Sequence, residues 1–338
     1  MMKKILAVVL FIIAASALQA KTPKLTFNDD GEFRMLQLTD CHMKFENPEE
    51  HSKTLARIDH VVNAEHPDVI VFTGDVVTGI RETRADMWNI VLKQMDSYKI
   101  PYVIAYGNHD AEGFPELTRP EMSGIVASGK YALNTLNEAG ELADMHIPVY
   151  PGKGDKPAFD IYVLDSHDYA EKYGYDNKYG KYAWFTHEQV EWLRNECIAR
   201  TEANGGVSVP SMAFFHIPLC EYEEAAAKGP VIGVKGEGVC SGPINSGMFA
   251  AMYETGSVMG VFAGHDHNNN YIVNHCGIAL GYGGFSGDDT TYNNLAHGLR
   301  IIVVKEGVRE FTTWIHDEDD RIGSVAEYKN GELVRIKK

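Results

Sequence analysis

Short apolar segments alternate with longer amphipathic segments along the chain. Residues 35–39, 69–73 and 102–106 are short and almost continuously apolar, which is typical of strands buried on both faces. The segments between them repeat their apolar residues at helical spacing. This order of strands and helices predicts an α/β fold in which helices cover the faces of a parallel sheet.

Helix-start residues precede several of the amphipathic segments. Asn47 and the following Pro48 are typical of a cap and a first helical position, and Glu50 stands three residues after the cap. Thr83 and Thr186 stand at equivalent cap positions before later segments. These residues predict where the helices begin.

The second half of the chain continues the alternation. It predicts further strands at 161–165, 212–215 and 258–262, and a helix at about 246–254. From Tyr271 onward, short strands and glycine-rich turns dominate.

The first twenty residues have the pattern of a secretory signal peptide (residues 1–20). Lys3 and Lys4 precede an apolar run that is shorter than the about 20 residues of a membrane-spanning helix. Small residues follow, and cleavage near Ala17 or Ala20 fits the pattern. We therefore expect a periplasmic or secreted protein without a membrane span.

Residues 21–338 show no internal repeat, low-complexity run or linker, which predicts a single domain. Its core is expected over about 33–305, followed by a C-terminal strand extension over 306–338. The net charge of −16 argues against a nucleic-acid-binding surface. The 5 cysteines include no Cys-x-x-Cys pair, so a thiolate zinc site is not indicated, and their disulfide pairing stays open.

Polar residues gather at the carboxyl ends of the predicted strands. Five strand ends are followed by Asp40, His42, Asp75, Asn108, His109, His216, His265 and His267. The carboxyl ends of strands face the ligand crevice in open α/β sheets, so we expect these side chains at one rim. Each motif alone also suits a helix cap, a turn or a buried histidine. Together they are costly to bury without a partner, and metal ions would be that partner.

Alternation along the extended chain favours two metal ions. Asp40 and His42 are two residues apart and therefore point to the same side, as do His265 and His267. With Asp75 between the two pairs, these side chains can hold two cations that share one carboxylate. Imidazole and oxygen ligands together suit Zn, Fe, Ni or Mn.

These motifs, in this order, resemble the calcineurin-like metallophosphoesterase superfamily. The resemblance runs from Met35 to His267 and includes Asp-x-His, Gly-Asp, Gly-Asn-His-Asp, a single His after a strand, and Gly-His-x-His. Segments 214–219, 243–249 and 261–271 look like the purple-acid-phosphatase-like branch of plant and fungal phosphatases. The resemblance implies a four-layer αββα sandwich of the metallo-dependent phosphatase type, with the metal site at the carboxyl ends of the strands.

The resemblance also implies a role for each motif residue. One metal ion would be held by Asp40, His42, Asp75 and His267, and the other by Asp75, Asn108, His216 and His265, with Asp75 bridging. The ions would be divalent or mixed-valent Fe, Mn or Zn. His109 would act as an acid or stabilise the phosphoryl group, and Asp110 would orient it. Thr78 stands where purple acid phosphatases carry a metal-bound tyrosine, which argues against a purple charge-transfer band and an Fe(III) preference.

The expected activity is hydrolysis of a small phosphate monoester by attack of a metal-bridging hydroxide on phosphorus. The alternative enzyme is a phosphodiesterase that acts on nucleotides or lipid headgroups with the same metals. A non-catalytic protein that binds metal or phosphate is the alternative from another class. Glu112, His167 and Asn245 are further candidates for substrate contact.

Overall fold

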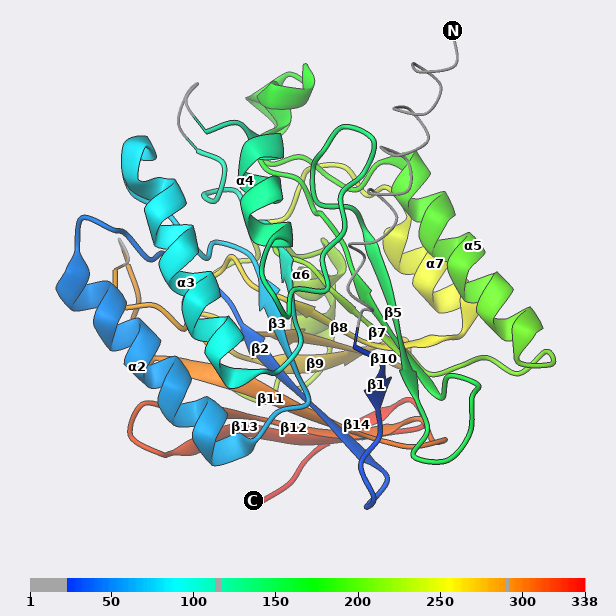
Figure 1. The fold of residues 1–338 in the computed structure, drawn as a ribbon. Coiled ribbons are helices and arrows are strands. Elements are labelled where there is room, and N and C mark those ends of the chain that lie inside the picture. The colour runs from blue at the N-terminus through cyan, green and yellow to red at the C-terminus, as the bar shows by residue number, and fades with distance from the viewer. Residues whose placement is uncertain (1–22, 113–116, 290–291, 338) are drawn as a thin grey trace, which may run out of the picture.

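Two mixed β-sheets pack face to face in the computed structural model, which describes residues 23–112, 117–289 and 292–337 (Figure 1). The predicted signal peptide lies outside the described residues. The first sheet consists of β1 (Leu25–Thr26), β5 (Met145–Tyr150), β6 (Phe159–Val163), β7 (Ser211–Phe214), β8 (Val258–Ala263), β10 (Ile278–Tyr282) and β9 (Ile272–His275), in that order. The second consists of β14 (Glu332–Arg335), β13 (Ile322–Lys329), β12 (Glu310–Asp317), β11 (Gly298–Lys305), β2 (Glu32–Leu38), β3 (Val69–Thr73) and β4 (Tyr102–Ala105).

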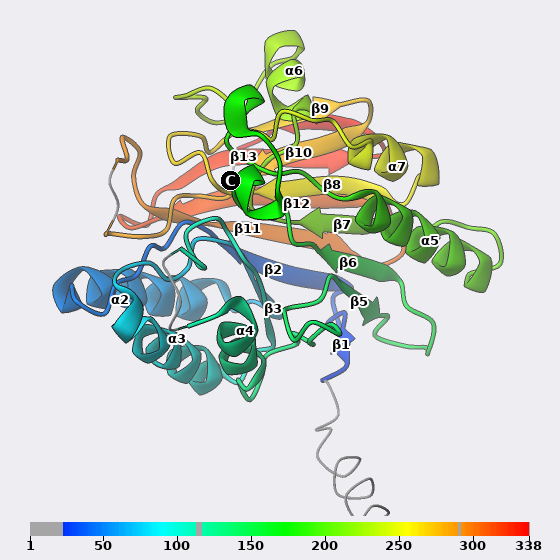
Figure 2. The same cartoon turned by 90° about the horizontal axis from the view of Figure 1, so that it is seen from above.

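Helices cover the outer face of each sheet, as Figure 2 shows from above. The second sheet is covered by α2 (Pro48–Glu65), α3 (Arg84–Tyr98) and α4 (Arg119–Ala127). The first is covered by α5 (His187–Ala203), α6 (Glu221–Lys228) and α7 (Met248–Thr255). Short 3₁₀ turns are η1 (Arg81–Thr83), η2 (Ala170–Tyr173) and η3 (Asn177–Tyr179). The four-layer αββα sandwich that the resemblance implied is confirmed.

The central strands are buried on both faces, which explains their almost continuous apolar sequences. Leu36 of β2 and Ile70 of β3 pack in the cluster between this sheet and its helices. Their neighbours Met35 and Val71 point the other way, into the cluster between the two sheets. Alternate side chains of an extended chain serve opposite faces, so a strand with two covered faces needs apolar residues throughout.

The strands that carry the polar motifs belong to both sheets of this sandwich, whereas the strand pattern alone indicates a single parallel sheet. β2, β3 and β4 run parallel in the second sheet, whereas β6, β7 and β8 run parallel in the first. A run of apolar residues shows that a strand is buried but does not show which strand it pairs with. The predicted C-terminal extension forms β12, β13 and β14, which complete the second sheet.

Most predicted helix starts coincide with observed ones, although their capping differs. The Thr186 side chain accepts a hydrogen bond from Gln189 N in a reciprocal capping box. Asn47 precedes Pro48 at the start of α2, but its amide donates to Asp289 Oδ2 and makes no cap. The sequence did not predict α4, α6, β1 or β5.

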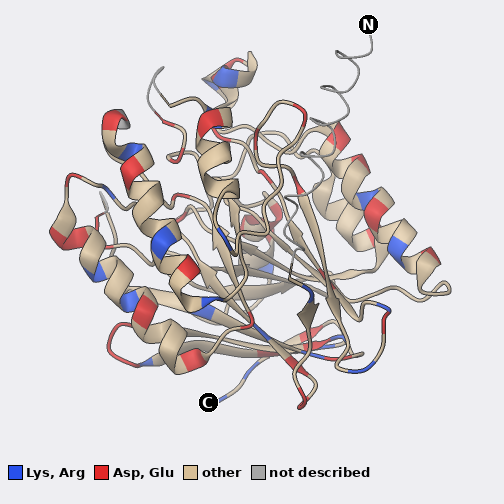
Figure 3. Cartoon of the chain, in the orientation of Figure 1, with Lys and Arg blue, Asp and Glu red and all other residues tan. Residues whose placement is uncertain are grey.

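Lys and Arg residues are interspersed with Asp and Glu residues along α2, α3 and α5 (Figure 3). Among the described residues, no helix is both long and apolar enough to cross a membrane. All five cysteines lie in the described segments and are free thiols, with Cys41 and Cys197 buried.

Candidate dinuclear metal centre

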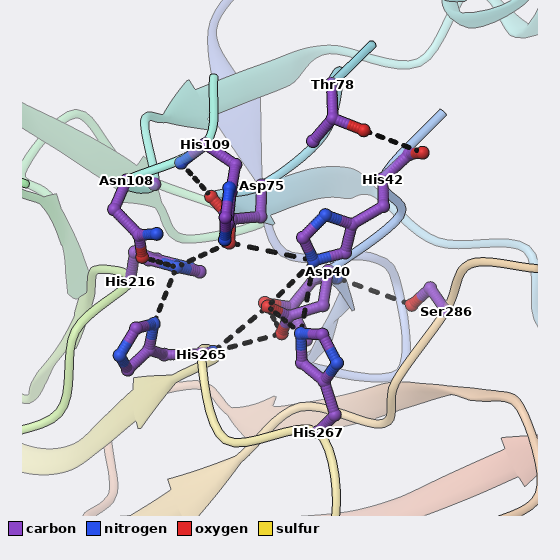
Figure 4. A network of polar contacts seen from close by, with 12 residues as sticks. Asp40, His42, Asp75, Thr78, Asn108, His109, His216, His265, His267 and Ser286 are labelled. Carbon is purple, nitrogen blue, oxygen red and sulfur yellow. Dashed lines mark hydrogen bonds and ion pairs between the residues drawn. The ribbon is translucent and has the colours of Figure 1, made fainter. Parts of the chain in front are cut away.

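The polar side chains predicted at strand ends come together in the structure (Figure 4). They lie on the loops after β2, β3 and β4 of one sheet and after β7 and β8 of the other. The site therefore lies where the carboxyl edges of the two sheets meet. Two clusters of possible metal ligands share this place, Asp40–His42–His267 and Asp75–His216–His265, and all six residues are buried.

The first cluster joins an aspartate and two histidines from different sheets. His42 Nε2 lies 3.1 Å from His267 Nε2, which lies 3.4 Å from Asp40 Oδ1. Two ligands that each lie ~2.1 Å from one ion are roughly 3.0–3.4 Å apart when the coordination angle is about 90–109°. Both distances therefore fit ligands of a single ion, while the third pair, His42 Nε2 and Asp40 Oδ1, is wider at 4.0 Å.

The second cluster is centred on His216. Its Nε2 lies 3.1 Å from Asp75 Oδ2 and 3.3 Å from His265 Nδ1. The same nitrogen lies 3.2 Å from Asn108 Oδ1. Asn108 turns its oxygen toward the cluster because its Nδ2 donates a hydrogen bond to the Tyr169 hydroxyl at 3.0 Å. The donor set of imidazole, amide and carboxylate suits a first-row divalent ion.

Asp75 lies between the two clusters. Its Oδ2 is 3.1 Å from His216 Nε2 and 3.7 Å from His42 Nε2, so one oxygen faces both groups. The other oxygen, Oδ1, accepts a hydrogen bond from the backbone N–H of His109 at 2.7 Å. This contact fixes the carboxylate in the orientation that a shared ligand needs.

Backbone carbonyls orient two of the imidazoles. His216 Nδ1 lies 2.8 Å from the carbonyl oxygen of Thr73, and His267 Nδ1 lies 3.0 Å from that of Tyr292. A carbonyl only accepts hydrogen bonds, so each Nδ1 carries a proton and each Nε2 faces its cluster with a lone pair when the ring is neutral. Such contacts are the usual way in which proteins orient metal-binding histidines.

The protonation of the buried side chains fits a cation site. Burial lowers the pKa of His42 to about 4 and that of His265 to about 3, so both rings are neutral at pH 7. Burial also disfavours a charged His216, but the adjacent Asp75 outweighs it and raises the pKa of His216 to about 10. The buried Asp75 carboxylate thus needs a positive charge beside it, which a metal ion would supply.

Backbone strain is concentrated at the ligands. Positive φ angles occur at Asp40 (52°), His42 (45°), Asp75 (51°) and His265 (78°). Left-handed backbone costs a non-glycine residue roughly 1–2 kcal/mol and persists where the surrounding structure enforces it, often at functional sites. The loops are therefore bent to direct these side chains inward.

Glycines allow the loops to approach one another closely. A Cβ on Gly264 would lie 1.8 Å from Thr39 Oγ1 and 2.8 Å from Asp40 Oδ2. A Cβ on Gly107 would lie 2.2 Å from Asp75 Oδ1. Both glycines directly precede proposed ligands, which explains the Gly-His and Gly-Asn pairs of the motifs.

Asp110 does not have the position that the resemblance implied for it. Its two oxygens accept hydrogen bonds of 2.7–3.0 Å from the backbone N–H groups of Gly107, Asp75, Val76 and Val77. Asp110 therefore ties the loop after β3 to the loop after β4. The carboxylate that contacts the His109 imidazole is that of Glu112, whose Oε2 lies 2.6 Å from His109 Nδ1.

Glu112 and Tyr169 link His109 to the second cluster. The Tyr169 hydroxyl donates to Glu112 Oε1 and accepts from Asn108 Nδ2. Burial opposes a charged His109, but the contact with Glu112 raises its pKa above the ordinary value. Glu112 was expected only as a possible substrate contact, and Tyr169 was not predicted. The tyrosine-rich run from 169 to 182 was the available sequence signal.

An open pocket of about 280 Å³ lies over the two clusters. Besides cluster residues, its lining includes Lys44, Thr78, His109, Tyr182 and Tyr292. The Tyr182 ring stands edge-on to His265 at 4.4 Å, and the Tyr292 ring stacks on His267 at 4.5 Å. Thr78 donates its hydroxyl to the His42 carbonyl at 3.1 Å.

Two other sequence candidates lie outside this pocket. His167 Nε2 is 2.9 Å from Gln189 Oε1, and His167 lines a separate cavity with Tyr173. Asn245 donates to Glu221 Oε1 at 2.8 Å and also lines another cavity. The structure therefore places neither residue beside the metal clusters.

The chain is similar to known proteins over most of its length. The chain is 30% identical over 318 residues to "Probable inactive purple acid phosphatase 14" of Arabidopsis thaliana, covering 83% of this chain and 77% of that protein. It is 29% identical over 325 residues to "Phosphatase DCR2" of Saccharomyces cerevisiae, covering 86% of this chain but only 54% of that protein. A dimetal phosphatase from Danio rerio has a similar fold, with a TM-score of 0.60, 12% identity, and coverage of 88% of this chain and 99% of that one.

The family match spans nearly all of the region that carries the two clusters. The model of the calcineurin-like phosphoesterase family matches residues 33–269, which include every proposed ligand from Asp40 to His267. The chain therefore belongs to the calcineurin-like phosphoesterase family.

Proposed function

We propose that this protein is an exported phosphatase that hydrolyses small phosphate monoesters at a dinuclear metal centre. The observation that carries the proposal is the position of Asp75, whose Oδ2 faces both His42 and His216. One shared carboxylate between two ligand clusters suits a pair of ions, which act together on a phosphoryl group. We assign Asp40, His42, Asp75 and His267 to one ion, and Asp75, Asn108, His216 and His265 to the other.

When bound, the metal pair supplies a water molecule whose pKa is lowered toward about 7 and polarises the phosphoryl oxygens; Fe, Mn and Zn all fit the donors. The chain's own contribution to bond cleavage is His109. Because Nδ1 is engaged by Glu112, Nε2 is the nitrogen available to the substrate. The raised pKa of His109 favours a protonated ring, which can give a proton to the leaving oxygen.

The word "inactive" in the name of the Arabidopsis relative raises the alternative of a non-catalytic protein. Against it, this chain keeps the ligands of both clusters and places His109 on the pocket wall. A protein that only bound metal would not need an imidazole held by Glu112 beside the clusters. These features support catalysis.

The test combines metal analysis with assays of a chromogenic phosphate monoester and the matching diester. We expect at least two metal ions per chain, two of them at the clusters joined by Asp75, and faster turnover of the monoester than of the diester. Preference for the diester would support the phosphodiesterase alternative. Absence of bound metal, with no rescue by added Mn, Fe or Zn, would refute the dinuclear centre.

His109→Ala separates catalysis from metal binding. It should lower kcat by about 10²–10⁴ and leave the metal content unchanged. His187→Ala, at the exposed start of α5, is the matched control and should behave as wild type.

N-terminal sequencing of the exported protein tests the predicted signal peptide. We expect the mature chain to start after Ala17 or Ala20.

A further inference from the structure

A third group of metal-ligating side chains lies apart from the catalytic pocket. His60 is on the exposed side of α2, His316 is near the end of β12, and Asp320 is in the turn between β12 and β13. One ligand atom from each residue lies within 4.8 Å of the others. The described lining of the catalytic pocket is formed by different residues.

The three side chains converge on one oxygen. Asp320 Oδ1 lies 2.6 Å from His60 Nε2 and 3.0 Å from His316 Nε2. His60 is 51% exposed and Asp320 is 64% exposed, whereas His316 is buried beneath them. The group is therefore closed on the protein side and open to water on the other.

Glu65 determines which nitrogen of His316 faces this group. Glu65 Oε1 lies 2.8 Å from His316 Nδ1 and also accepts a hydrogen bond from Trp314 Nε1 at 3.0 Å. An ionised carboxylate only accepts hydrogen bonds, so His316 Nδ1 carries the proton. In the neutral ring, Nε2 then directs a lone pair at the Asp320 carboxylate, and these two electron-rich groups repel unless a proton or a metal ion lies between them.

The backbone also holds Asp320 in this position. Its φ of 59° is left-handed, a conformation that costs most residues free energy although Asp tolerates it better than most. Its N–H donates to the Asp317 carbonyl at 3.2 Å, which closes the turn. A carboxylate, two imidazoles and an open side match the three protein ligands plus water of a four-coordinate zinc site.

We propose that His60, His316 and Asp320 form a third metal site, which binds Zn²⁺ or a similar borderline divalent ion. Two imidazole ligands disfavour Ca²⁺ and Mg²⁺, which prefer oxygen. The ion joins α2 to the turn after β12. Its role is structural, because the catalytic pocket is lined by other residues.

The experiment counts metal ions in the full chain. The protein is saturated with Mn²⁺, incubated with Zn²⁺, freed of unbound metal by gel filtration, and analysed for the sum of Mn and Zn. Counting the sum makes exchange within the catalytic centre irrelevant. We expect wild type to hold one more ion per chain than His60→Gln or Asp320→Asn, and the control His187→Gln to match wild type.

Two further measurements complete the test. Zn²⁺ should raise the thermal midpoint of the Mn-saturated wild type but not that of His60→Gln. Glu65→Gln should weaken binding of the additional Zn²⁺ by about 10- to 100-fold, because it removes the carboxylate that orients His316. Equal metal content in wild type and His60→Gln, with the same change of thermal midpoint on adding Zn²⁺, would overturn the proposal. The three side chains would then be held together by hydrogen bonds alone.

Discussion

Glu112 Oε2 lies 2.6 Å from Nδ1 of His109, three residues earlier in the chain. The contact pairs a carboxylate with the imidazole that lies next to the proposed metal ligands. It sets the ring orientation, because Nδ1 is the bonded nitrogen and Nε2 is left for the substrate. It also raises the pKa of His109 and lowers that of Glu112, so each group favours the charged form of the other.

Replacing Glu112 by Gln should change the pH profile of the enzyme. If protonated His109 acts as the acid, activity falls as the pH rises through its pKa. Loss of the Glu112 charge lowers that pKa, so the alkaline limb of kcat should move to lower pH. The control is Glu49→Gln, which replaces an exposed glutamate of α2 and should leave the pH profile of kcat as in wild type. An unshifted alkaline limb would contradict the role of His109 as the acid.

Tyr169→Phe should lower kcat and weaken metal binding at the cluster that includes Asn108, because the hydroxyl orients that ligand. The change removes the hydroxyl that donates to Glu112 and accepts from Asn108. Hydrogen bonds to charged groups contribute about 1.5–3 kcal/mol, and loss of even the smaller value corresponds to roughly a 10-fold change. Tyr179→Phe, at an exposed tyrosine, is the control. Unchanged kcat would mean that Glu112 needs no support from Tyr169.

Gly264→Ala should weaken the metal site formed by Asp40, His42 and His267. The new methyl group would lie 1.8 Å from Thr39 Oγ1 and 2.8 Å from Asp40 Oδ2, so the loop or the carboxylate must move. Displacing groups that orient ligands typically costs about 10- to 100-fold in metal affinity. Competition with a chelator measures the effect.

The control for this experiment is Gly238→Ala, where an added Cβ meets nothing within 4 Å. Both substitutions add one methyl group, so a difference between them reports contact with the site. If the two variants held metal equally well, the loop after β8 would be more adaptable than the contacts indicate.

Arg57→Met should destabilise the protein on the order of 3 kcal/mol at neutral pH. Arg57 is buried, and its guanidinium lies 2.7 Å from Asp288 and 2.8 Å from Glu318. Burial alone would raise the pKa of Asp288, but Arg57 holds it below 3.8. The stabilisation from this pair is therefore present above pH 3.8 and lost as the pH falls through the pKa of the folded state.

Urea unfolding at several pH values measures this effect. The difference in unfolding free energy between wild type and Arg57→Met should shrink below pH 3.8. Lys53→Met on the same helix removes a surface pair with Glu49 and Glu50 and should destabilise the protein much less than Arg57→Met. A constant difference across the acid range would show that packing of the Arg57 side chain matters more than its charge.

Much of the fold and of the metal site followed from the sequence. Strand segments such as 69–73 were predictable because burial on both faces requires apolar residues at every position. Asp40 and His42 were predictable at one rim, because a strand end faces the crevice. The alternation argument was wrong for them, because both residues have left-handed backbone and the chain is not extended there.

Sequence pattern could not identify the partners of those residues. It did not show that Asp110 accepts hydrogen bonds from backbone amides while Glu112 contacts His109, because both carboxylates lie within reach along the chain. Nor could it bring Tyr169 to Glu112, since that contact depends on a loop from the other sheet.

By itself, the sequence determined which residues are buried, where strands end, and which side chains of the motifs can bind metal. Tertiary structure decided that the strand ends come from two sheets, and that Asp75 lies between two clusters. It also brought His60 and His316 to the same oxygen of Asp320. The physical reason is that burial and backbone direction are local properties, whereas the distance between two loops depends on how the sheets and helices pack.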